Sequence, residues 1–216
     1  MNMENCKFKG LFLDLDGTLI NSAPMMHEIM KEIFQKYNLG SVSESMMTKF
    51  AGLPAKLFFD SLDHVNKDDF LKDIVTLEKK YRSLAPSYPE VTELISTISD
   101  KGLPLAVISS QAGLEMDLVK ISYDFAPRID FWLSADDVQK HKPDPEGIYI
   151  ALNHFDIPAK NILFVGDTVY DIQAGKSAGV STGAALWGGH NQDLLTTSNP
   201  DFTFTKPFQI LTHFGL

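Results

Sequence analysis

Hydrophobic and polar positions divide the chain into three stretches with different periods. The first is a near-continuous apolar run around Leu11–Leu15, which is typical of a strand buried on both faces of a parallel sheet. Residues 21–88 repeat apolar side chains at helical spacing, with no run that indicates a strand. From residue 89 onward, short apolar runs alternate with amphipathic segments, which is the pattern of βαβ units.

The second stretch predicts an all-helical insert. Ser22 is expected to be an N-cap, and Pro24 stands just inside the helix, where its missing N–H does no harm. This first helix carries its apolar face to Tyr37 and ends at Asn38-Leu39-Gly40. Further helices are expected at residues 44–50, 55–62 and 68–84.

The third stretch predicts the larger part of an α/β fold. Strands are expected at residues 105–108, 131–133, 162–165, 182–186 and 202–204. Helices are expected at residues 90–101, 114–121, 145–155, 169–178 and 207–213. We therefore predict a core with a central parallel sheet from residues 1–20 and 89–216, with residues 21–88 inserted as an all-helical cap.

Composition narrows the possible partners. The 216 residues are 44% hydrophobic and 22% charged, as in an ordinary globular protein, and the formal net charge is −9. This charge argues against nucleic acid or a membrane surface as the main partner. A single cysteine, Cys6, excludes an internal disulfide framework. The first ten residues lack a hydrophobic signal core, so we expect a cytoplasmic protein.

The acids at the end of the first apolar run are the first candidate site. Burying ionised carboxylates is costly unless a cation or N–H donors receive them, and a divalent metal meets that need. Side chains alternate along a strand, so we expect Asp14 and Asp16 to share a face, and Gly17 to let the chain turn out of the sheet directly after them. The alternative is a hairpin turn at Asp16-Gly17, with Asp14 as a partly exposed strand residue.

Two other predicted strands also end in polar residues. The strand at 105–108 leads into Ser109 and Ser110, whose hydroxyls and backbone N–H groups suit an anion, although Ser109 could equally cap the next helix. The strand at 162–165 leads into Asp167 and Asp171. Four residues apart on an early helical turn, these two acids can face one point, or Asp171 can serve only the helix dipole.

A basic segment lies between those two strands. Lys140 and Lys142 precede the Pro143 and Pro145 pair, which restricts the backbone and opens a helix. Such rigidity suits a lysine that must stay in one place. The alternative is that both lysines are solvated loop charges.

Together these motifs resemble the haloacid dehalogenase superfamily, and within it the phosphatase branch with a helical cap, of the phosphoglycolate phosphatase-like type. Four motifs occur in the expected order, namely Asp14-Leu15-Asp16-Gly17-Thr18, then Ser109, then Lys142 in a Lys-Pro-Asp-Pro setting, then Gly166-Asp167 with Asp171. The resemblance spans the whole core and implies a Rossmann-like three-layer arrangement. Ser110 departs from the pattern, because relatives often carry Asn there.

The resemblance also implies a Mg²⁺-dependent phosphomonoester hydrolase. Asp14 would be the nucleophile and form an aspartyl-phosphate, and Asp16 would be the general acid and base. Mg²⁺ would be held by Asp14, the Asp16 carbonyl and Asp167, with Asp171 positioning a ligand or water. Phosphoryl oxygens would contact Ser109, Ser110 and N–H groups near Gly17, while Lys142 would balance charge and orient the nucleophile.

The substrate is expected to be a small phosphorylated metabolite that is selected by the cap. Candidate anion contacts are Lys56 in the loop 50–56, Lys49, His27 and Arg82, each of which could instead be a solvated surface residue. The loop at Trp187 is expected to border the cleft or to join the core. Alternatives within the class are a pyrophosphatase, a nucleotide or sugar-phosphate phosphatase and a phosphomutase, and outside it a catalytically silent phosphoryl-ligand sensor. A monomer or homodimer is expected.

Overall fold

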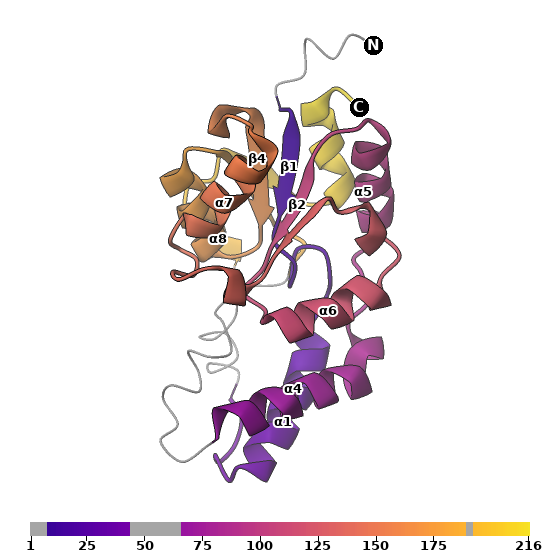
Figure 1. Ribbon diagram of the computed structural model, residues 1–216, viewed down its shortest axis with the longest axis vertical. Coiled ribbons are helices and arrows are strands. Elements are labelled where there is room, and N and C mark those ends of the chain that lie inside the picture. The colour runs from indigo at the N-terminus through magenta and orange to yellow at the C-terminus, as the bar shows by residue number, and fades with distance from the viewer. Residues whose placement is uncertain (1–7, 44–65, 189–191) are drawn as a thin grey trace.

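The computed structural model describes residues 8–43, 66–188 and 192–216. Within them, six strands form one sheet in the order β3-β2-β1-β4-β5-β6, and every neighbouring pair is parallel. The strands are β1 (Gly10–Leu13), β2 (Leu105–Ile108), β3 (Phe131–Leu133), β4 (Ile162–Gly166), β5 (Ser181–Ala185) and β6 (Phe202–Phe204). This sheet confirms the predicted α/β fold with a central parallel sheet (Figure 1).

Helices surround the sheet. The described α-helices are α1 (Ala23–Lys36), α4 (Lys67–Tyr81), α5 (Val91–Asp100), α6 (Gly113–Ser122), α7 (Glu146–Phe155), α8 (Val169–Ala178) and α9 (Gln192–Thr197). Short 3₁₀ helices are η2 (Arg82–Leu84), η3 (Ala126–Arg128), η4 (Ala135–Asp137), η5 (Ala159–Asn161) and η6 (Pro207–Phe214). None of the described helices combines the length and the apolar character that crossing a membrane requires.

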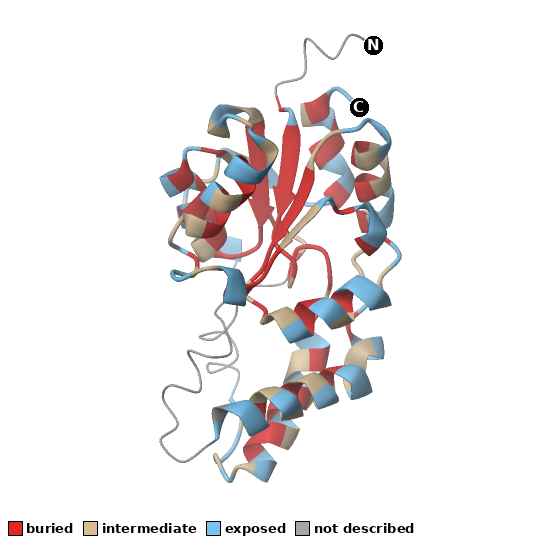
Figure 2. Ribbon diagram, viewed as in Figure 1, coloured by how far each residue is buried: buried red, intermediate tan, exposed pale blue. Residues whose placement is uncertain are grey.

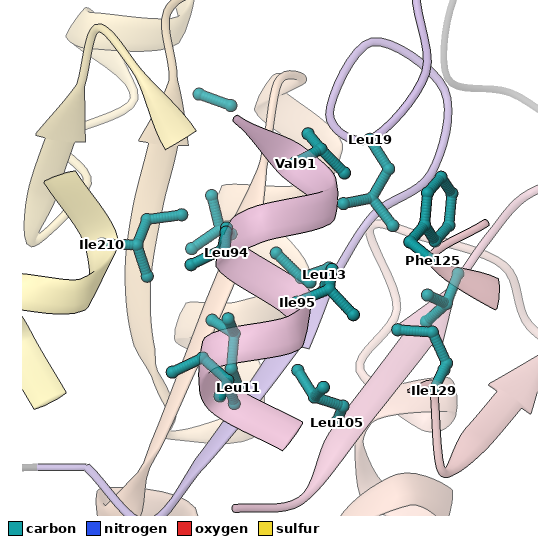
Figure 3. Close-up of a cluster of buried hydrophobic side chains, with 14 of the residues drawn as sticks. Leu11, Leu13, Leu19, Val91, Leu94, Ile95, Leu105, Phe125, Ile129 and Ile210 are labelled. Carbon is teal, nitrogen blue, oxygen red and sulfur yellow. The ribbon is translucent and has the colours of Figure 1, made fainter. Parts of the chain in front are cut away.

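The alternation of side chains along β1 separates two apolar layers. Leu11 and Leu13 point to one face, where they pack in one cluster with Leu94 and Ile95 of α5 and with Ile210 of η6 (Figure 3). On the opposite face Phe12 packs in a second cluster with residues of α7 and α8. The sheet is therefore covered on both faces, as its continuous apolar strands require, and Figure 2 shows its central strands buried between helices with exposed outer surfaces.

Helices α1 and α4 pack together beyond the carboxyl ends of the strands (Figure 1). Ile29 and Ile33 of α1 and Phe70 and Ile74 of α4 belong to one cluster of buried side chains, which is separate from the two sheet clusters. The pair lies within the stretch that we predict to be the cap. The division of the chain at residues 20 and 89 stays a prediction.

Several predicted elements differ from the structure at their ends. The predicted helix over residues 68–84 is α4 followed by the tighter turn η2, and the predicted C-terminal helix is the 3₁₀ helix η6. Ser22 is the N-cap residue of α1, as predicted, although its side chain makes no capping hydrogen bond. Helix α9 was not predicted, and the helices expected at 44–50 and 55–62 lie outside the described residues.

Candidate active site

Asp14 stands at the carboxyl end of the central strand. Strand β1 lies between β2 and β4, and the backbone N–H of Asp14 still donates to the Val165 carbonyl of β4 at 2.9 Å. Its side chain is buried, with the residue only 6% exposed. A carboxylate at this edge of a parallel sheet lies where such sheets bind ligands.

Lys142 joins two of the predicted acids. Its Nζ donates to Asp14 Oδ1 at 2.5 Å, to Asp171 Oδ1 at 2.7 Å and to the Ile108 carbonyl at 3.2 Å. Lys142 is buried, whereas the Lys140 side chain is 73% exposed. The alternative of solvated loop charges is therefore right for Lys140 and wrong for Lys142.

Burial and neighbouring charges shift the pKa values of Asp14 and Lys142 in opposite directions. Burial raises the pKa of Asp14 to about 7, although the neighbouring Lys142 ammonium lowers it. Burial also lowers the pKa of Lys142, but the Asp14 and Asp171 carboxylates raise it by more, so the pKa ends above its usual range. The lysine therefore keeps its charge, and one ammonium must serve two carboxylates.

Asp16 lies in the turn that follows the strand. Because β1 ends at Leu13, strand alternation does not place Asp14 and Asp16 on one face, and that step of the prediction is wrong. The neighbours of β1 are parallel, so the hairpin alternative is wrong as well. Gln111 Nε2 donates to Asp16 Oδ2 at 2.8 Å. Burial raises the pKa of Asp16, while the Ser22 hydroxyl and the Gln111 amide beside it lower it.

Gly17 allows this turn to pass close to Asp167. Its φ is +80°, and a Cβ there would lie 2.0 Å from Asp167 Oδ2. The Gly17 N–H donates to the Ile20 carbonyl at 2.8 Å, so this donor is already used within the turn. Thr18 Oγ1 donates to Asp167 Oδ1 at 3.2 Å. The expected contact between Gly17 and a phosphoryl group remains a prediction.

Asp171 serves both purposes that the sequence left open. Its Oδ2 accepts from the Thr168 N–H at 3.0 Å and from Thr168 Oγ1 at 2.6 Å, which caps the start of α8. Its Oδ1 accepts from Lys142. Both oxygens therefore accept hydrogen bonds, which fits a residue that holds its neighbours in place.

The donor set fits a hard divalent cation. Asp14, Asp167 and Asp171 are buried and each offers a carboxylate oxygen, and these oxygens lie within 4.8 Å of one another. Burial raises the pKa of Asp167 well above its usual value, and the charges of Asp14 and Asp171 raise it further. The Lys142 ammonium pairs with two of these carboxylates, those of Asp14 and Asp171. A cation with oxygen ligands would offset the remaining negative charge.

Ser109 follows β2 and faces the same edge of the sheet. It is buried, and its Oγ accepts from the Gln111 N–H at 3.0 Å. The N-cap of α6 is Ala112, so Ser109 does not cap that helix. Ser109, Ser110 and Lys142 line one small pocket beside the end of β2. This placement brings the hydroxyls of the second motif next to the lysine of the third.

The other predicted contacts are spread more widely. Lys49 and Lys56 lie outside the described residues, and His27 is exposed on α1. Arg82 is partly buried at the start of η2. Trp187 packs against the core, which confirms one of the two expectations, and its Nε1 donates to the Thr18 carbonyl at 2.9 Å. That its loop borders the cleft stays a prediction.

Sequence reasoning missed residues that support the acids. Gln111 was not assigned a role, although it follows directly on Ser109 and Ser110. Glu78 and Glu115 are buried at 1% and 5% exposure, but nothing in a helical pattern distinguishes a buried glutamate from an exposed one. Thr18 lies inside the first motif, and its position next to two acids is the signal that could have suggested a hydrogen bond to a carboxylate.

Known proteins resemble this chain over nearly its whole length. A phosphoglycolate phosphatase of Aquifex aeolicus is 30% identical in an alignment that covers 93% of this chain and 94% of that protein. Pyrophosphatase PpaX of Anoxybacillus flavithermus is 28% identical, covering 95% and 96% of the two chains. A Lactobacillus plantarum crystal structure, provisionally assigned as a phosphoglycolate phosphatase, superimposes with a TM-score of 0.83 at 30% identity, covering 96% and 99%.

The family model described as haloacid dehalogenase-like hydrolase matches residues 11–185. That range begins in β1 and ends with β5, so it contains every acid of the candidate site. The chain is therefore an enzyme of the haloacid dehalogenase-like hydrolase family.

Proposed function

We propose that this hydrolase is a Mg²⁺-dependent phosphomonoesterase that works through an aspartyl-phosphate on Asp14. The observation that carries the proposal is the arrangement at the end of β1. There, a buried carboxylate is held at 2.5 Å by Lys142, and a second acid follows two residues later, held by Gln111. A fixed nucleophile beside an acid with a raised pKa suits displacement at phosphorus.

In the first half-reaction, an Asp14 oxygen attacks phosphorus as the bond to the leaving oxygen breaks. Protonated Asp16 donates its proton to that oxygen, so the product leaves as an alcohol and Asp16 becomes a carboxylate. Lys142 keeps the attacking carboxylate oriented through its contact with Oδ1. The Ser109 hydroxyl is placed at the same edge to hold a phosphoryl oxygen.

In the second half-reaction, Asp16 accepts a proton from water. The resulting hydroxide attacks phosphorus, the Asp14–phosphorus bond breaks, and inorganic phosphate leaves. Asp16 regains its proton and Asp14 is again a carboxylate, so the cycle closes. Splitting the hydrolysis in this way replaces one difficult step by two easier displacements.

Asp14, Asp167 and the Asp16 carbonyl would hold Mg²⁺, and Asp171 would keep this group in position. When bound, the cation supplies positive charge that stabilises the phosphoryl oxygens and offsets repulsion between the acids. The acids Asp14 and Asp167 fit this role because each is buried and their pKa values are raised.

For the substrate we propose a small phosphorylated metabolite of the phosphoglycolate type. The support is the similarity to relatives that carry that name over 93% or more of the chain. Pyrophosphate is the second candidate, since relatives at 28% identity are named pyrophosphatases. Cytoplasmic location and a monomer or homodimer remain predictions.

The test is phosphate release from a panel of phosphoglycolate, pyrophosphate, a sugar phosphate and a nucleotide. We expect turnover with Mg²⁺ and none in excess EDTA. Asp14→Asn, which is nearly isosteric, should lower kcat by at least about 10³-fold, the order lost when an activated nucleophile is removed. Full activity in chelator, or in Asp14→Asn, would refute the proposed mechanism.

The mass of a covalent adduct provides a second test of the proposed mechanism. Wild-type protein quenched in acid during turnover should gain the mass of one phosphoryl group, and Asp14→Asn should gain none. Circular dichroism of both proteins checks that the substitution leaves the fold intact. Turnover without any adduct would point to direct attack by water.

A further inference from the structure

A second cluster of buried charges lies where α4 meets the sheet-bearing part of the chain. Glu78 of α4, Arg82 of η2 and Glu115 of α6 form it, and we call these three residues the junction cluster. Both glutamates are almost completely buried, and α4 packs against α6. The proposed reaction steps use none of the three. Buried charges of this kind need partners, so each one raises the question of what it binds.

Arg82 has donors that the described residues do not satisfy. Its Nη2 donates to Glu78 Oε2 at 2.6 Å, which fixes the guanidinium at one corner. Nε and Nη1 are buried, and within the described parts of the chain neither nitrogen has an acceptor. Buried N–H groups without acceptors are costly, and a charged donor costs more than a neutral one. These two donors make Arg82 a candidate for binding a ligand.

Arg82 lies near the part of the chain that carries Asp16. Four residues after Arg82, the Pro86 carbonyl accepts from the Asn21 N–H at 2.9 Å, so the segment that carries Arg82 runs along the turn after β1. The charge of Arg82 also lowers the pKa of Asp16 in that turn. The centroid of the Tyr123 ring lies 6.0 Å from the guanidinium carbon, and a hydrogen bond with Tyr123 contributes to the raised pKa of Arg82. Asp16 is the residue proposed to protonate the leaving oxygen.

We propose that Arg82 is a specificity-determining residue that binds an anionic group carried by the leaving group of the substrate. This inference rests on the proposed function and narrows its substrate class. Guanidinium groups suit carboxylates and phosphates alike. Phosphoglycolate would present a carboxylate and pyrophosphate a phosphate at this place, so the two candidate substrates share the required chemistry.

The test compares two substrates that differ only in that charge. Phosphoglycolate and its uncharged amide have leaving alkoxides of similar basicity, so they place similar demands on Asp16. Wild-type protein should prefer the acid in kcat/KM. Arg82→Gln should lower kcat/KM by roughly 100-fold for phosphoglycolate, as expected for loss of a charged partner, and change the amide by less than about 3-fold. Pyrophosphate, measured in parallel, shows whether a phosphate is accepted in place of the carboxylate.

Two further variants serve as controls for this test. Arg128→Gln removes an exposed arginine that is paired with Asp100, and it should leave both substrates unchanged. If Arg82→Gln folds poorly because Glu78 loses its partner, Glu78→Gln/Arg82→Gln removes both charges and should show the same loss of preference. An equal fall for the acid and the amide would show that Arg82 acts only through Asp16, and would overturn the inference.

The outcomes also separate this inference from the proposed function. A chain that hydrolyses phosphoesters but does not prefer anionic leaving groups contradicts the role of Arg82 alone. A chain that releases phosphate from no member of the panel contradicts the phosphatase proposal, and the role of Arg82 falls with it. A preference that survives Arg82→Gln assigns anion recognition to another residue.

Discussion

At the scale of single residues, one buried ammonium holds the candidate site together. Lys142 contacts Asp14 and Asp171 and carries a raised pKa because of them. Removing one partner of a buried ion pair strongly lowers the free energy of unfolding, because the other charge stays buried without a counter-charge. Lys142 therefore contributes to stability as well as to the orientation of the nucleophile.

Lys142→Met should destabilise the metal-free protein by roughly 3–5 kcal/mol at pH 8, because two buried carboxylates lose their counter-charge. Urea denaturation followed by circular dichroism measures the change. Lys140→Met is the matched control, since this exposed lysine lies 3.8 Å from Asp144 and should change stability by less than about 0.5 kcal/mol. Equal effects of the two substitutions would contradict the ion-pair argument.

Asp16→Ala should separate the two half-reactions. With p-nitrophenyl phosphate the leaving phenolate hardly needs a proton, so Asp14 should still become phosphorylated. Breakdown of the adduct still needs a base and should slow by roughly 10²–10⁴-fold. Rapid-quench kinetics should show a burst of nitrophenolate near one equivalent per site, followed by slow turnover.

A metabolite ester provides the control for this variant. Its alkoxide leaving group needs the acid in the first step, so Asp16→Ala should give no burst with it. Intact-protein mass spectrometry should find the phosphoryl adduct only with the aryl ester. Parental turnover of both substrates would show that Asp16 has another role.

The residues found from sequence and those missed differ in a physical way. Asp14, Asp167 and Lys142 could be located because an acid at the end of an apolar strand, or a lysine before a proline pair, breaks an expected pattern. Gln111 and Glu78 break no pattern. Their burial depends on contacts between distant segments, and a helical period does not encode which polar side chain another element will cover.

At the scale of elements, the loop after β5 holds the turn after β1 in place. Trp187 donates to the Thr18 carbonyl, and Tyr88 donates to the Gly188 carbonyl at 3.3 Å. A Cβ on Gly188 would lie 2.4 Å from the Gly17 carbonyl oxygen and 2.7 Å from Asp167 Cβ. The backbone at Gly188 therefore packs directly against the backbone at Gly17, next to the acids of the candidate site.

Gly188→Ala should displace this loop and lower kcat by about 10²-fold, the effect of roughly 1 Å of misplacement in an active site. The cause is steric, because the contacted carbonyl oxygen is backbone and cannot rotate away. Gly113→Ala is the control, since its new Cβ would meet mainly the Asp136 side chain at 3.3 Å. Unchanged kcat in Gly188→Ala would show that the loop can move without cost.

Strands and helices could be predicted from the sequence where the spacing of apolar residues followed a single period. The apolar strands β2 and β4 and the amphipathic helix α7 were placed within about one residue. Strand β1 was drawn too long, because the apolar residues Leu15 and Leu19 continue its composition although the chain has already left the sheet. Those two side chains are buried in the core from a turn, so hydrophobicity alone could not mark where the strand stops.

At the scale of the whole molecule, buried acids make stability depend on pH. Burial first, then neighbouring charges, raise the folded-state pKa of Asp14 to about 7, of Glu78 to about 8 and of Glu115 to about 7. Above pH 5 the unfolded chain has released protons that these groups still hold in the folded chain. The free energy of unfolding of the metal-free protein should therefore fall as the pH rises from about 5 to 8.

Mg²⁺ should reverse that fall, because its carboxylate ligands bind it only when they have lost their protons. At a concentration 100 times the dissociation constant at pH 8, Mg²⁺ adds about 2.7 kcal/mol to the free energy of unfolding. The same concentration should add much less at pH 5, where protons compete for the carboxylates. Urea denaturation at both pH values, with Mg²⁺ or with EDTA, measures this gain.

Asp167→Asn should lose the gain from Mg²⁺. It should keep the part of the pH dependence that comes from Glu78 and Glu115, because these two residues lie at the junction with α4 and not among the proposed ligands. Equal gains at both pH values, or a full gain in Asp167→Asn, would place the cation elsewhere.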